Sequence, residues 1–154
     1  MSSYQVDVIV RAAFADRISA RWLRDVVEAA LRAEEQPEDA ELTLLITDDK
    51  ETQALNKRFR DTDRPTDVLA FGGSEEEPFV TPKGFPIYLG DVVISYPRAV
   101  AQAKSAGHSV KDELALLIIH GCLHLLGYEH AEERERREMW ERQEEIKNAF
   151  FAEA

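Results

Sequence analysis

The residues of this chain that could do chemistry gather in one stretch, "IIHGCLHLLGYEH" (118–130), which holds three of its four histidines. His120 and His124 are four residues apart, so on a helix they point from the same face. Gly127 permits the left-handed turn that ends a helix, and three residues later His130 can return to meet the other two. Three neutral imidazoles that converge predict a zinc-type site with an open fourth position, the arrangement of catalytic rather than structural zinc.

The spacing H-x3-H-x2-G-x2-H also occurs in metzincin peptidases, whose general base is a glutamate directly after the first histidine. Here that position is Gly121, so the base needed for peptide hydrolysis is missing. Glycine inside a helix costs about 1 kcal/mol relative to alanine, and two interpretations account for it. Either another backbone or a bulky substrate comes close to the metal there, or the helix packs tightly on a neighbour.

The other candidate ligands near this stretch are expected to have structural roles. Cys122 lies two residues from His120, about 200° around a helix, so it faces away from the histidines. It is predicted to be a small core residue. His108 precedes the helix and is predicted to be a surface or capping residue.

Length, charge and cysteine content limit the class of protein. The chain has 154 residues, enough for a single domain over 1–154. One cysteine excludes an intrachain disulfide and indicates a reducing compartment. No signal peptide is apparent, and the longest apolar stretch, 114–126, is too short to span a bilayer, so we expect a cytoplasmic protein without a membrane. The net charge of −11 disfavours general nucleic-acid binding, although the segment 56–64 is locally basic.

Hydrophobic periodicity predicts the elements that position the histidines. We expect strands at 4–10, 41–47, 66–71 and 89–95, and a long loop over 72–88. We expect helices at 16–35, from Ser95 to Gly107, from Ser109 to Leu126, and from Glu132 onward. Another helix, capped by Thr47 or Asp48, is expected to carry Leu55 and Phe59. The helix from Glu132 onward carries Met139, Gln143, Ile146 and Phe150 along its packed side. The order indicates an α+β fold, a mixed four-stranded sheet with about five helices and the metal site on a buried central helix.

Three blocks of the sequence resemble the signature of a known family. They are "LNKRFRDTDRPTDVLAFGG" (55–73), "LGDVVIS" (89–95) and "HGCLHLLGYEH" (120–130). In this order they resemble the YbeY family, the single-strand-specific endoribonucleases and ribosomal RNA maturation factors of bacteria. The resemblance implies a metal-dependent endoribonuclease with single-stranded ribosomal RNA as substrate. It also implies association with the small ribosomal subunit and a part in ribosome quality control.

The resemblance also assigns site residues. It implies that His120, His124 and His130 bind one metal ion, with zinc the usual assignment. It implies that Arg60, together with His120, is needed for activity. Arginine suits this role because its planar donors match a phosphate and it stays charged. From the residues alone, the alternative for Arg60 is a surface salt bridge with one of the neighbouring acids, Asp61, Asp63 or Asp67.

Several alternatives stay open from the sequence. The group that removes the proton is a metal hydroxide, a substrate phosphate oxygen or Glu129. The last stands where the family usually has aspartate, and we favour it as a partner that orients a histidine. Asp91 is either a further such carboxylate or a turn residue after Gly90. The competing functions are a metzincin-like metallopeptidase and a non-catalytic, zinc-stabilised ribosome-assembly factor. The sequence does not indicate an oligomeric state.

Overall fold

A four-stranded mixed sheet forms the centre of the fold in a computed structural model that describes residues 4–72 and 87–153. Its strands are β1 (Gln5–Val10), β2 (Glu41–Thr47), β3 (Val68–Gly72) and β4 (Tyr88–Ser95). The spatial order is β1-β2-β4-β3. The pairs β1–β2 and β2–β4 are parallel, and β3 runs antiparallel to β4. The predicted strands and the mixed sheet are therefore confirmed.

Five α-helices accompany the sheet within the described residues. They are α1 (Ala20–Ala33), α2 (Asp49–Arg60), α3 (Tyr96–Ala106), α4 (Val110–Leu125) and α5 (Glu133–Glu153). The side chains of Ser19, Asp48, Ser95 and Ser109 each accept a hydrogen bond from a backbone N–H three residues later, which fixes where the first four helices begin. The first helix begins later than predicted because a 3-10 turn (Ala12–Phe14) and the Ser19 cap precede it. The predicted loop falls mostly on residues 73–86, outside the described residues.

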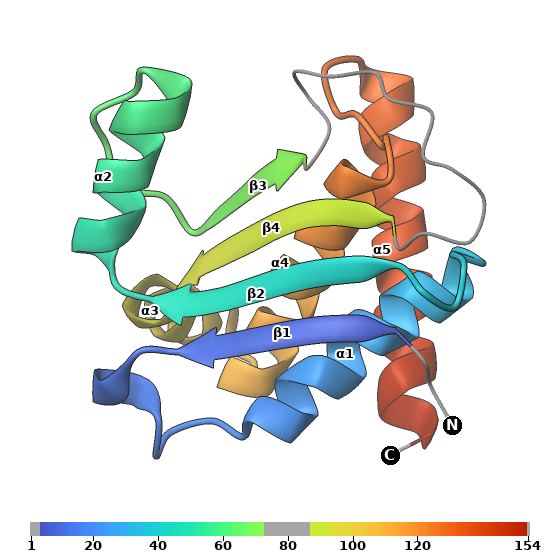
Figure 1. The fold of residues 1–154 in the computed structure, drawn as a ribbon, viewed down its shortest axis with the longest axis horizontal. Coiled ribbons are helices and arrows are strands. Elements are labelled where there is room, and N and C mark those ends of the chain that lie inside the picture. Colours follow the sequence, from blue (N-terminus) through green and yellow to red (C-terminus); the bar gives the residue numbers. More distant parts are fainter. Residues whose placement is uncertain (1–3, 73–86, 154) are drawn as a thin grey trace.

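Helices α1, α4 and α5 lie on one side of the sheet, while α2 stands at the end to which β2 leads (Figure 1). Helix α4 contacts β3 and β4, and α1 contacts β1. Helix α5 packs on α1 and α4. None of the helices in residues 4–72 and 87–153 is long and apolar enough to cross a membrane. The α+β architecture is thus confirmed, with α4 at its centre.

Helix α4 is buried on nearly all sides, as its sequence predicts. Leu114, Ile118, Ile119 and Leu123 are fully buried and pack in one core with the inward residues of the sheet. Burying each such side chain contributes about 1.5–3 kcal/mol, so this helix is held firmly against the sheet. Side chains that project from its C-terminal half therefore have a rigid base.

Candidate metal centre

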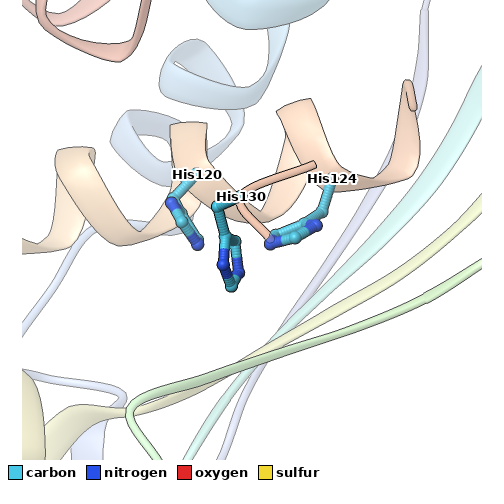
Figure 2. A group of neighbouring side chains, drawn as sticks. All are labelled: His120, His124 and His130. Atoms are coloured by element: carbon cyan, nitrogen blue, oxygen red, sulfur yellow. The ribbon is translucent and has the colours of Figure 1, made fainter. Parts of the chain in front are cut away.

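The three histidines of the 118–130 stretch meet at the C-terminal end of α4, as predicted (Figure 2). His120 and His124 project from the last turns of the helix, and His130 lies in the segment that leads to α5. The ring centroids are 4.9 Å apart for His120 and His124, 4.7 Å for His124 and His130, and 5.7 Å for His120 and His130. One nitrogen of each ring lies within 4.8 Å of the others. This spacing is on the scale of two metal–nitrogen bonds of about 2.0–2.1 Å each, so the cluster can hold a metal ion.

A Schellman turn brings His130 back to the helix. The N–H of Tyr128 donates to the carbonyl oxygen of Leu123 at 3.0 Å, and the N–H of Gly127 donates to that of His124 at 3.1 Å. This motif needs a left-handed residue after the helix, and Gly127 has a φ of 101°. The glycine that the sequence marked as a helix stop is therefore the residue that makes the convergence of histidines possible.

The turn is tied to two distant helices through Tyr128. Its side chain is hydrogen-bonded to Glu34, the residue that ends α1. Arg142 of α5 donates to the Glu34 carboxylate at 2.7 Å and to the Ala33 carbonyl oxygen at 2.6 Å. Because Arg142 and Glu34 are half-buried or better, this pair is screened less than a surface pair. The segment that carries His130 is thus held from both sides.

A second contact from α5 orients His120. The Nδ1 atom of His120 lies 2.9 Å from Oε1 of Gln143, which is 4% exposed. An amide oxygen only accepts, so Nδ1 carries the proton and Nε2 keeps the lone pair that binds a metal. Sequence reasoning placed Gln143 on the packed side of the last helix but missed this role. The available signal was a polar residue between Met139 and Ile146, both apolar and buried.

The electrostatic environment favours the neutral, metal-binding form of His120 and His124. Burial lowers the pKa of His120. Burial also lowers the pKa of His124 to about 4, with further contributions from the nearby charges of His120, His130 and Arg60. A hydrogen bond with the backbone of Tyr128 opposes this shift in part. Because a metal competes with protons for the imidazole lone pair, rings that are neutral near pH 7 favour metal binding.

The histidines line a hollow of about 820 Å³ that Arg60 also lines. Arg60 ends α2. Its guanidinium donates to the carbonyl oxygen of Ala70 in β3 and lies 5.3 Å from the ring centroid of Phe71. The charge of Arg60 also contributes to the lowered pKa of His124. The structure therefore places the predicted arginine and the predicted histidines in one hollow.

Gly121 faces the sheet, which decides between the two interpretations of this glycine. A Cβ atom added at this position would lie 2.6 Å from Cγ1 and 3.2 Å from Cγ2 of Val92 in β4. Contacts this short require a shift of a fully buried, β-branched side chain. Tight packing of helix on sheet thus accounts for the glycine. A metzincin-type glutamate has no room at this position.

The remaining candidates differ in outcome. Cys122 is fully buried in the core, as predicted. Both predictions for Asp91 are wrong: it lies within β4 rather than in a turn, and its neighbour Val92 points to α4 and Gly121. Successive strand residues face opposite sides, so Asp91 faces away from the histidines and accepts a hydrogen bond from the Tyr88 hydroxyl. Glu129 is exposed and lines the histidine hollow; its orienting role stays a prediction.

A family model and the relatives found by sequence agree on one family. The family model described as Endoribonuclease YbeY matches residues 10–150. The chain is 44% identical over 136 residues to an Endoribonuclease YbeY of Dehalococcoides mccartyi, covering 83% of this chain and 85% of the relative. It is 42% identical over 151 residues to that of a Roseiflexus species, covering 97% and 94%. A solution structure of a Thermotoga maritima protein superposes with a TM-score of 0.64 at 25% identity, covering 97% of this chain and 91% of the other.

Proposed function

The chain belongs to the YbeY endoribonuclease family, and we propose that it is a zinc-dependent, single-strand-specific endoribonuclease that matures ribosomal RNA. The observation that carries this proposal is the trio of histidine rings in a hollow that also contains an arginine side chain. Imidazole nitrogens suit a divalent transition metal, and a guanidinium suits a phosphate. Hydrolysis of a phosphodiester uses both.

His120, His124 and His130 are the proposed ligands of one metal ion, for which zinc fits the all-nitrogen donor set. When bound, the ion supplies a Lewis acid beside the scissile phosphate. Gln143 fixes the tautomer and the ring plane of His120, and the Schellman turn at Gly127 fixes where His130 lies. The chain thus prepares the ligand set before the metal arrives.

Arg60 is the proposed phosphate-binding residue. Its bond to the Ala70 carbonyl and its position over the Phe71 ring hold the guanidinium in the wall of the histidine hollow. A guanidinium there neutralises the charge that develops on the phosphate in the transition state. Removing one such stabilising donor lowers kcat by about 10²–10³-fold in other enzymes, which sets the expected size of the effect of Arg60→Ala.

Membership of the family supports a proposal for the substrate and the setting. The proposed substrate is unpaired ribosomal RNA of the small ribosomal subunit, and the enzyme would serve in subunit maturation and ribosome quality control in the cytoplasm. The proposed catalytic unit is one domain over 1–154, since α1, α2, β3, α4 and α5 all contribute to the metal centre or its hollow.

A metallopeptidase is less well supported by the same geometry. The position of the metzincin base is Gly121, where Val92 leaves no space for a side chain. In addition, β3 is an edge strand of the described sheet, and its Ala70 carbonyl oxygen already accepts a hydrogen bond from Arg60. An extended peptide added to a sheet edge needs such backbone acceptors.

The test is cleavage of an unstructured RNA oligonucleotide and of the same sequence in a duplex by zinc-loaded protein. We expect cleavage of the single strand, a much slower reaction with the duplex, and no cleavage of casein. His120→Ala should abolish RNA cleavage, and Arg60→Ala should lower kcat about 10²–10³-fold. If the wild-type protein cleaves no RNA with zinc, manganese, cobalt or nickel, the nuclease function is refuted. The non-catalytic ribosome-assembly factor is then the favoured alternative.

His108→Ala is the matched control for the histidine variant. His108 lies before α4, where its Nε2 atom is 2.7 Å from the carboxylate of Glu113, and it is outside the cluster of three histidines. This variant should keep wild-type cleavage and one bound zinc per chain. If His108→Ala and His120→Ala were equally active, the cleavage would come from a contaminating nuclease.

A further inference from the structure

A tryptophan stands at the border of the proposed metal centre with half of its surface in water. Trp140 of α5 is 53% exposed, although its neighbour Met139 is fully buried and Gln143, one turn later, is 4% exposed. The indole ring centroid is 6.1 Å from that of His120, and the ring planes are 79° apart. The same helix side that orients His120 through Gln143 therefore also places an exposed aromatic surface beside this ligand.

The second tryptophan of the chain shows what a structural role looks like in this fold. Trp22 is half-buried, its ring packs edge-on against Phe150 at 6.0 Å, and the Lys111 ammonium lies 5.3 Å from its ring centroid. Core packing and a covering cation account for Trp22. Trp140 contacts His120, and half of its surface remains exposed.

Two guanidinium groups lie one turn away from this surface. Arg136 and Arg137 precede Trp140 by four and three residues, so they share its side of the helix, and both are exposed. Arg137 is 3.7 Å from the Glu133 carboxylate, but a pair between exposed side chains contributes little. On the following turn, Glu144 is paired with Lys147 at 3.6 Å. An aromatic platform with arginines beside it is the composition that binds single-stranded nucleic acid.

We propose that Trp140 is a stacking platform for one unpaired nucleobase of the substrate, next to the phosphate held at the histidines. This inference rests on the proposed function and gives it a physical basis for strand selectivity. A base in a duplex is already stacked and paired, so neither of its faces is available to an indole. Arg60 reaches the hollow from the side of α2 and β3, whereas Trp140 stands on α5. The RNA strand would then run from Arg60 across the histidines to Trp140.

The first test is an abasic scan of a single-stranded RNA with one defined cleavage site. Abasic nucleotides are placed one at a time on either side of that site, and kcat/KM is measured for the zinc-loaded wild type and for Trp140→Ala. At one position the missing base should lower kcat/KM of the wild type about 5- to 150-fold, the range for loss of one stacked base. At the same position the missing base should not lower kcat/KM of Trp140→Ala any further. This variant has already lost the stacking contribution, through a higher KM. Trp140→Phe should restore most of the loss.

The second test reads the stacking directly. The chain has two tryptophans, so Trp22→Phe leaves Trp140 as the only indole. Its fluorescence should be quenched by the single-stranded RNA and not by the duplex, in zinc-loaded protein. Val100→Ala, which shortens an exposed apolar side chain of α3, is the control and should behave as the wild type in the scan.

The outcomes separate the two proposals. If the wild type cleaves no RNA, the nuclease function itself fails. If it cleaves RNA but the wild type and Trp140→Ala respond identically at every abasic position, the platform is refuted. Trp140 then only packs on His120, a role that would change zinc affinity and leave the scan unaltered. Unquenched Trp140 fluorescence with a cleavable single strand would refute it as well.

Discussion

Replacement of Gln143 by alanine tests the link between α5 and the metal centre. The Gln143 side chain is buried, and its Oε1 atom is 2.9 Å from Nδ1 of His120. Gln143→Ala removes this acceptor and leaves the Nδ1–H group of a half-buried ring without its partner. The His120 ring can then rotate, or its proton can move to Nε2. In either case the Nε2 lone pair is no longer held toward the other two histidines.

Two independent arguments give the size of the effect. A buried donor that loses its acceptor costs about 1–3 kcal/mol. Loss of a hydrogen bond to a metal-binding histidine lowers metal affinity by about 10- to 100-fold in other sites, which is about 1.4–2.8 kcal/mol. The ranges overlap, so we expect zinc to bind Gln143→Ala roughly 10- to 100-fold more weakly.

The assay is competition for zinc between the folded protein and a chromophoric chelator at pH 7. Gln143→Glu keeps an acceptor at this position and should keep the affinity within a few-fold of the wild type. Asn148→Ala removes a side-chain amide from an exposed position of the same helix and should change nothing. Equal zinc affinity for Gln143→Ala and the wild type, with circular dichroism showing both folded, would refute the orienting role.

Three further predictions concern stability and reactivity. Gly121→Ala should destabilise the fold by about 1 kcal/mol in urea unfolding, because overpacking against Val92 costs about 1–3 kcal/mol and the gain in helix propensity is about 1. In a Val92→Ala background the same change should instead be stabilising, and equal effects in both backgrounds would contradict the packing argument. The hydrogen bond from Arg98 holds the pKa of Asp49 below 3.8, helped by Ser95 and opposed by burial. A lowered carboxyl pKa stabilises the fold above the ordinary pKa and ceases to do so as pH falls through the lowered one. Asp49→Asn should therefore cost about 1 kcal/mol at pH 7, a small value because the pair is partly exposed; the difference should vanish well below pH 3.8, and a pH-independent difference would disprove this. Burial raises the pKa of Cys122 to about 12, so a thiol reagent at pH 8 should label it only with unfolding, and rapid labelling of native protein would contradict its core position.

The parts of the fold that were predictable depend on local patterns. Strand β2 has the predicted bounds, Glu41–Thr47, because polar and apolar residues alternate at its start and the Asp48 cap of α2 directly follows its end. Helix starts are marked by capping residues such as Ser95, and helix ends by Gly107 and Gly127. Both signals depend on the backbone geometry of only a few neighbouring residues. The histidine convergence is local in the same sense, since the helix pitch and one left-handed turn determine it.

The parts that were not predictable depend on contacts between distant segments. The face of Asp91 could not be read from β4 because Val92, Val93 and Ile94 are all buried, and a strand covered on both sides lacks the alternation that reveals its orientation. The packing of Gly121 on Val92 was one of two interpretations until the helix and the sheet were placed together.

Helix α5 connects metal binding to its own docking on the rest of the fold. It supplies Gln143 to the ring of His120 and Arg142 to Glu34, which in turn holds Tyr128 beside His130. A metal that binds the three histidines favours the ring positions that these contacts also favour. By linkage, metal binding and the docking of α5 must stabilise one another. A local sequence motif thus places the ligands, while a helix that begins only after the motif determines how tightly they hold an ion.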